Sequence, residues 1–354
     1  MFRRFGSFLC LCLCFLLGAT GCITPISVAL DGQLTSSKPI EAAIRADLSP
    51  QNSPEPLNSV VLPGSSGAHR VAIIELDGLL VQESLVGLGS QGSNPVALFH
   101  EKLQAAEQDP LVVGVVLRIN SPGGTVGGSD LITNEIHRFR ERTGKRVVAH
   151  ILETGTGGAY LAASASDRIT ISPAATVGGI GVVFPVVVLE KMLDILSIAD
   201  QSIKSGDHID LGTASRRMDP AEREMIEVMA REHHDRFKTA VCASRKVSEK
   251  LLDGRVMTST MALNGGLVDE ICSLEDAVGI AAGQKGKSGA TGAVEIVMYR
   301  RGQETVRSVY DTVANQPLQG TVLPISIPGL ERTRQGGFWY LWMSDPTMTR
   351  MTGK

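Results

Sequence analysis

The architecture of this chain can be inferred outward from Thr154-Gly155-Thr156-Gly157-Gly158-Ala159-Tyr160. This stretch follows the β-branched run Arg146–Leu152 and precedes the small-residue segment Leu161–Ala165. The pattern predicts a strand that stops at glycines and restarts as a helix. Backbone N–H groups at a helix N-terminus are unpaired and favour negative charge, so a nucleophile and an oxyanion hole can be built there together. Thr156 stands at the centre of this turn.

Apolar runs and helical periodicities on both sides of this stretch alternate along the chain. Strands are expected at Val71–Leu76, Leu111–Ile119, 146–152 and Arg168–Ile171, with helices over Pro95–Glu107, from Ser129 to a stop at Gly144, and over Pro220–Lys246. The last helix is expected to place Met225, Met229, Phe237 and Val241 on one face. The order predicts an α/β fold with a parallel sheet covered on both faces and right-handed crossovers.

Composition narrows the functional class. The 354 residues carry a net charge of −3, so nucleic acid is a poor candidate partner. Outside the N-terminal region, the cysteines are Cys242 and Cys272, and their spacing to each other and to the histidines indicates no metal site. The favoured interpretation is that both cysteines are buried free thiols, and the alternative is a single disulfide between them. No cofactor is expected.

The N-terminus has the pattern of an export signal. Arg3 and Arg4 precede the apolar stretch Phe8–Leu17, which is shorter than the roughly 20 residues of a membrane span. Ala19-Thr20-Gly21-Cys22 then resembles a bacterial lipoprotein cleavage site. We therefore expect Cys22 to be lipidated and the protein to be exported and anchored to a membrane of the cell envelope. A plain secretory signal and an uncleaved anchor are the alternatives.

Four regions follow from these patterns. Residues 1–22 are a lipoprotein-type signal peptide, and residues 23–69, rich in Ser, Pro, Asn and Gly, are a flexible tether. Residues 70–281 are the folded domain, and 282–354 are a linker and C-terminal extension. The aromatic cluster Phe338-Trp339-Tyr340-Leu341-Trp342 in that extension is interpreted as a packing or docking element.

Several short motifs occur in a specific order, although each of them alone is weak evidence for any function. They are Leu117-Arg118-Ile119-Asn120-Ser121-Pro122-Gly123-Gly124, Gly157-Gly158-Ala159-Tyr160, Asp167-Arg168-Ile169, Thr176-Val177-Gly178-Gly179-Ile180-Gly181-Val182, Lys204-Ser205-Gly206, Asp253-Gly254-Arg255-Val256 and Gly265-Gly266-Leu267-Val268-Asp269. Together the chain from about 71 to 275 resembles the signal peptide peptidase A family, membrane-associated bacterial serine peptidases with a Ser/Lys dyad. The resemblance implies a single catalytic domain with the Clp protease/crotonase-like spiral of β-β-α units.

The resemblance also implies roles for individual residues. Thr156 stands where the family has its nucleophilic serine, and Lys204 where it has the general base. Gly123-Gly124 would supply one oxyanion N–H and Gly157 the other. A free lysine has a pKa of about 10.4, so Lys204 must be desolvated or lie near positive charge to act as a base. One copy of each motif marks a short form, for which the family implies a homo-oligomer in which the lysine reaches a neighbouring protomer.

Threonine at the nucleophile position leaves two functions open. Its β-methyl group stiffens χ1 and crowds the attack trajectory, and Thr156 is internal, so no terminal amine can serve as its base. The favoured interpretation is an endopeptidase that cleaves extended apolar peptides, such as released signal peptides, by acyl-enzyme chemistry. The alternative is a catalytically impaired peptide-binding or scaffold protein. A crotonase-type acyl-CoA enzyme is disfavoured by the expected export.

A groove for such a peptide has one candidate in the sequence. The valines of Gly181–Val188 could line it and pair with a substrate strand through the backbone. A core strand or helix is the alternative preferred for most of these side chains.

Overall fold

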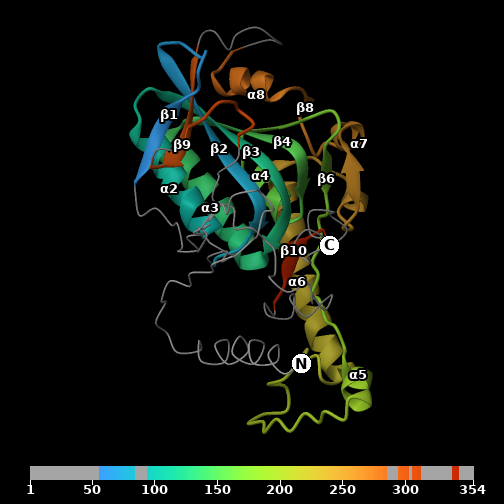
Figure 1. Cartoon of the computed structure of the whole chain (residues 1–354). Coiled ribbons are helices and arrows are strands. Elements are labelled where there is room, and N and C mark those ends of the chain that lie inside the picture. Colours follow the sequence, from blue (N-terminus) through green and yellow to red (C-terminus); the bar gives the residue numbers. More distant parts are fainter. Residues whose placement is uncertain (1–55, 84–93, 285–293, 303–304, 312–336, 343–354) are drawn as a thin grey trace, which may run out of the picture. The chain divides into compact units, whose positions relative to one another are not determined.

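The computed structural model describes residues 56–83, 94–284, 294–302, 305–311 and 337–342 (Figure 1). The expected signal peptide, its Cys22 and most of the expected tether lie outside these ranges. Within them, no helix has both the length and the apolar character needed to cross a membrane.

A mixed sheet forms the centre of the fold, and most of its pairs are parallel, as the strand order predicts. Its path runs β1 (Leu57–Val61), β9 (Val294–Arg301), β2 (His69–Leu80), β3 (Val112–Thr125), β4 (Arg146–Thr156), β5 (Arg168–Ile171) and β8 (Glu270–Ile271). Every neighbouring pair from β9 to β8 is parallel, and β1 closes the far edge antiparallel to β9. The predicted α/β class is confirmed.

The sheet buries both of its faces. Along β2, Ala72 and Ile74 point into one apolar cluster, and Val71 and Ile73 point into another. This alternation is what a strand covered on both sides requires. The first cluster includes side chains of α2 (Pro95–Gln108), α3 (Val126–Thr143) and α4 (Gly158–Ser164); the second includes those of α8 (Leu274–Ala281).

The folded unit is larger than the predicted domain 70–281. β1 comes from the expected tether and β9 from the expected C-terminal extension, and the two pair from Leu57↔Arg301 to Val61↔Val297. Val294, Ile296 and Met298 of β9 are buried in the second apolar cluster. The sheet thus continues beyond both ends of the predicted domain, because β9 pairs beside β2 and β1 pairs beside β9.

Most helix positions agree with the prediction, with two corrections. The helix expected at Ser129 begins instead at Val126, because Thr125 caps it by accepting the Gly128 N–H at 3.1 Å. Gly144 ends it in the left-handed conformation, as predicted. α6 (Pro220–Ser244) buries Ile226, Phe237 and Val241, and the expected Met225 and Met229 are exposed.

Short strands extend the sheet at the ends of β3 and β4. β6 (Thr176–Gly178) pairs with β4 and with β7 (Val256–Thr258), and β10 (Trp339–Leu341) pairs with β3. Among the described residues, the other helical elements are α5 (Glu190–Ile195), a 3-10 turn (Glu249–Leu251) and α7 (Ser259–Asn264). Cys242 and Cys272 are both free; Cys272 is buried as expected, and Cys242 is exposed.

Candidate active site

The predicted turn at Thr156 is a tight strand-to-helix elbow. β4 ends at Thr156, and α4 starts at Gly158. Between them Gly157 has φ 55° and ψ −127°, a backbone conformation that residues with a Cβ avoid. Thr156 is completely buried at this elbow.

The glycine turn of β3 packs directly against the elbow. Gly123 has φ 106°, and a Cβ there would lie 2.9 Å from the Gly158 nitrogen and 3.1 Å from the Thr156 carbonyl oxygen. Only glycine allows this approach. Ser121 holds the turn, because its hydroxyl donates to the Gly78 carbonyl at 2.6 Å and accepts the Gly123 N–H at 3.1 Å. The structure thus brings Thr156 together with Gly123, Gly124 and Gly157.

The Thr156 hydroxyl has a backbone partner in this arrangement. Its Oγ1 donates to the Pro122 carbonyl oxygen at 3.2 Å. Gly179, with φ 62°, lies beside it: a Cβ on Gly179 would be 3.3 Å from the Thr156 Cβ. The absence of a side chain at Gly179 leaves room next to the threonine, which is bulkier than serine.

The three predicted oxyanion donors differ in their availability. The Gly157 N–H donates to the Gly178 carbonyl at 2.9 Å, and the Gly123 N–H to Ser121. The Gly124 amide lies opposite Tyr340 in the β3–β10 ladder. Gly124 is therefore the donor that faces β10, and a role for Gly157 requires its bond to Gly178 to be shared or released.

Lys204 lies in an environment unlike the one that the prediction demands. Its Nζ is 2.6 Å from Asp210 Oδ2, and 35% of its side chain is exposed. Arg216 also contacts Asp210, and the hydrogen bonds from Arg216 and Lys204 hold the pKa of that carboxyl far below its usual range. Among the described residues, no hydrogen bond or ion pair joins Lys204 to Thr156. The expected desolvation of Lys204 is thus absent within a single chain.

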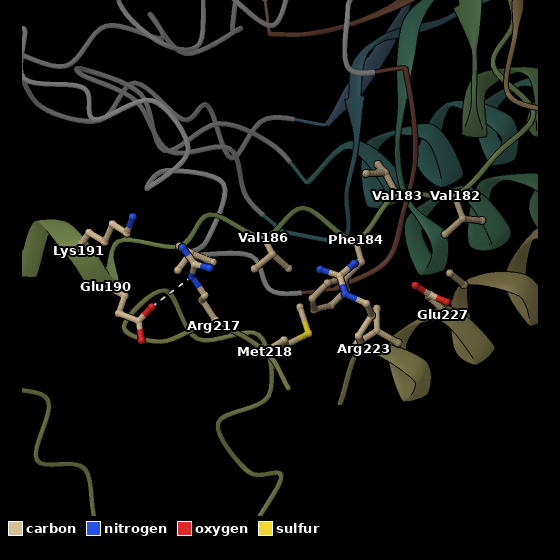
Figure 2. A pocket seen from close by; sticks show the side chains of 13 residues that line it. Val182, Val183, Phe184, Val186, Glu190, Lys191, Arg217, Met218, Arg223 and Glu227 are labelled. Carbon is tan, nitrogen blue, oxygen red and sulfur yellow. Dashed lines mark ion pairs between the residues drawn. The ribbon is translucent and has the colours of Figure 1, made fainter. Parts of the chain in front are cut away.

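A cavity of about 750 Å³ lies along the Gly181–Val188 segment. Figure 2 shows its side chains: Val183, Phe184 and Val186 come from this segment, and Arg223 and Glu227 from α6. The valine segment is neither a regular strand nor a helix and is only half-buried. The segment therefore lines a cavity, and the preferred alternative of a core strand or helix is wrong; the binding of a substrate peptide in this cavity stays a prediction.

A buried group of charged residues, centred on Glu75 of β2, was not predicted from the sequence. Lys102 Nζ lies 2.6 Å from Glu75 Oε2, and Arg300 Nη1 lies 2.5 Å from Glu75 Oε1. Burial opposes the ionisation of Glu75, but Lys102 and Arg300 outweigh it and hold its pKa below the usual range. Glu75 inside an otherwise apolar strand was the available signal, because a carboxylate there needs a buried partner.

Arg118, from the motif that ends in Gly123-Gly124, is a further buried charged residue, and it contacts the C-terminal part of the chain. It is 1% exposed, pairs with Asp77 at 2.9 Å and donates to the carbonyl oxygens of Val309 and Asp311 at 2.7 and 3.0 Å. This guanidinium fixes the strand that carries the glycine turn.

Fold and site together define an α/β protein of Clp protease/crotonase architecture, with a hydroxyl side chain at an elbow facing a glycine turn. Residues 140–287 match the family described as "Peptidase family S49". This match and the relatives described next support membership of the signal peptide peptidase A family.

Similar proteins bear names consistent with this family. The chain is 26% identical over 295 residues to "Serine protease SPPA, chloroplastic" of Arabidopsis thaliana, covering 82% of this chain and 42% of that protein. It is 28% identical over 231 residues to "Putative signal peptide peptidase SppA" of Enterococcus faecium, with 64% and 67% covered. It is 28% identical over 228 residues to "Protease 4" of Salmonella typhi, with 63% and 36% covered. The match therefore spans less than half of the plant and Salmonella proteins.

Proposed function

We propose that this protein is an endopeptidase that hydrolyses extended apolar peptides, with Thr156 as the nucleophile. The observation that carries the proposal is the placement of the Thr156 hydroxyl at an elbow pressed against the Gly123-Gly124 turn. The Gly181–Val188 groove beside it offers apolar side chains to a peptide, and the Val183 backbone of this segment already pairs with Trp339 as it would with a peptide in strand conformation. Released signal peptides fit this description.

The chemistry requires a base that a single chain does not provide. In the proposed reaction the Thr156 hydroxyl attacks the peptide carbonyl, its proton passes to Lys204 and then to the leaving amine, and water hydrolyses the resulting ester. The Gly124 N–H supports the oxyanion. Because Lys204 is exposed, we propose that it acts on the Thr156 of a neighbouring protomer in a homo-oligomer.

Exposed apolar side chains around Lys204 support that arrangement. Ile195, Ile203 and Ile209 have relative exposures of 82%, 101% and 71%. Apolar side chains gathered on one exposed segment mark an interaction surface. Their burial between protomers would also desolvate Lys204, which is the condition for its role as a base.

The second candidate is a peptide-binding or scaffold protein without catalysis. It is favoured by one observation: the Thr156 hydroxyl and the Gly157 amide both have backbone partners in this structure. For either function we propose an exported protein, anchored to a membrane through lipid on Cys22, on the strength of the N-terminal sequence pattern.

Mixing two inactive variants tests the peptidase proposal. The full chain in mild detergent should cleave a quenched apolar peptide, and Thr156→Ala and Lys204→Ala should each abolish cleavage. An equal mixture of the two variants should regain activity, since some neighbouring pairs then combine an intact Thr156 with an intact Lys204. Lys250→Ala, at a lysine outside the proposed site, is the matched control. Undiminished cleavage by Lys204→Ala would disprove the dyad, and no cleavage by the wild type or by Thr156→Ser would favour the scaffold.

A further inference from the structure

Strand β10 lies between the glycine turn of β3 and Val183, at the start of the groove. On one side, the Val126 N–H donates to the Phe338 carbonyl at 3.1 Å, and the Trp342 N–H donates to the Pro122 carbonyl at 3.2 Å. On the other side, Trp339 and Val183 exchange both backbone hydrogen bonds, at 2.9 and 3.0 Å. Residues 338–342 are thus an antiparallel strand inserted between the glycine turn and the start of the groove.

The register places one carbonyl of this strand at the predicted oxyanion site. Bonded pairs alternate in an antiparallel ladder, so Gly124–Tyr340, which lies between the bonded pairs 126–338 and 122–342, is also a hydrogen-bonded pair. A Cβ on Gly123 would lie 2.0 Å from the Tyr340 carbonyl oxygen, and one on Gly157 would lie 2.2 Å from it. This carbonyl therefore lies between the glycine turn and the elbow, beside the amides that are predicted to stabilise an oxyanion.

The side chain of Tyr340 fills a closed pocket. Tyr340 is 1% exposed, and its ring packs on Phe237 of α6, with centroids 4.6 Å apart. Its hydroxyl donates to the His233 carbonyl at 2.8 Å. A pocket with an aromatic wall and a polar acceptor at its end fits a tyrosine side chain.

The neighbouring residue links this pocket to the groove. The Phe338 ring lies 5.1 Å from that of Phe184 and 4.9 Å from that of His233, measured between centroids. Phe184 also lines the cavity of Figure 2. The N-terminal side of the inserted strand therefore points to the groove, as the part of a substrate before its scissile bond would.

We propose that residues 338–342 are a built-in substrate analogue that blocks the peptide groove, and that the Tyr340 pocket selects peptides with an aromatic residue before the scissile bond. This rests on the proposed peptidase site, because it assigns that site's specificity. Phe237 and the His233 carbonyl are the elements that determine this specificity.

Peptide binding tests the proposal independently of catalysis. The probe is a fluorescein-labelled Gly-Phe-Trp-Tyr-Leu-Trp peptide, measured by anisotropy on full-length protein carrying Thr156→Ala to prevent cleavage. We expect weak binding to this parent, at least tenfold tighter binding when Tyr340→Ala is added, and no change with Tyr310→Ala, a control at an exposed tyrosine. A probe with alanine in place of its tyrosine should bind the Tyr340→Ala protein at least tenfold more weakly.

Two results would overturn the proposal. One is equal binding of the probe with and without Tyr340→Ala, and the other is equal affinity for the tyrosine and alanine probes. Hydrogen exchange shows independently whether the strand has left the groove: the Gly124 and Val126 amides should exchange faster in Tyr340→Ala, and unchanged exchange would mean that β10 is a permanent part of the sheet. Binding without hydrolysis would refute only the peptidase function, whereas hydrolysis without tyrosine-dependent binding would refute only this inference.

Discussion

A buried histidine in β4 makes the stability of the fold depend on pH. His150 is fully buried, and its two ring nitrogens lie 2.9 Å from Thr170 Oγ1 and 3.1 Å from Ser172 Oγ. Burial lowers the pKa of His150 from 6.5 to about 4, although the carboxylates of Glu275 and Asp276 on α8 act in the opposite direction. The neutral ring is therefore the form that the native state accommodates.

The size of the effect follows from the two pKa values. Between about pH 4 and 6.5 the unfolded chain binds a proton that the native chain does not. The stability is therefore complete above pH 6.5 and is lost as the pH falls toward 4. Linkage gives a loss of about 2 kcal/mol between pH 7.5 and pH 5, and about 3 kcal/mol below pH 4.

Urea unfolding at pH 7.5 and pH 5, followed by tryptophan fluorescence, measures this loss. His150→Gln cannot titrate and should lose about 2 kcal/mol less than the wild type over this interval. The matched control His69→Gln, at an exposed histidine, should behave like the wild type. Equal losses in His150→Gln and the wild type would refute the assignment of the pH dependence to this side chain.

Three further outcomes are expected. Thr156→Ser, which removes the β-methyl group, should raise peptide turnover about tenfold, corresponding to about 1.4 kcal/mol of activation free energy, and a lower turnover would contradict the steric argument. Gly123→Ala should abolish hydrolysis and displace β10, because its methyl group would lie 2.0 Å from a β10 carbonyl oxygen. The displacement should be measured as faster hydrogen exchange. Gly127→Ala, whose added Cβ would have nothing within 4 Å, is the control. Lys102→Met should lower the free energy of unfolding by about 3–5 kcal/mol, because it leaves a buried carboxylate without one partner. The control Lys238→Met, which removes an exposed ion pair, should change it little.

Local patterns in the sequence were sufficient to predict the centre of the fold. The apolar runs that became β2 to β5 and the glycines after Thr156 carry their structural meaning within a few residues, so the sheet and the elbow could be predicted. The end of β3 could not, because it continues through Gly123 only by pairing with β10 and β2. Propensity alone would end a strand at such glycines.

Long-range pairing and assembly account for what the sequence did not predict. The partner of β1 lies more than 200 positions away in β9, and nothing local in either segment indicates the other. The burial of Glu75 with Lys102 and Arg300 is likewise a property of three distant segments. Lys204 was placed by a family motif, but its environment in one chain is an ion pair with Asp210. A motif gives the identity of a base and not the surface that would desolvate it.

Because β10 belongs to the same chain as the groove, dilution does not remove it. A tethered segment acts at an effective concentration on the order of millimolar. A free peptide of equal intrinsic affinity must reach about that concentration before it occupies half of the grooves. The inserted strand therefore makes the occupancy of the groove by free peptide depend on the local peptide concentration. A dilute peptide does not displace the strand, whereas a peptide that has accumulated locally binds in its place.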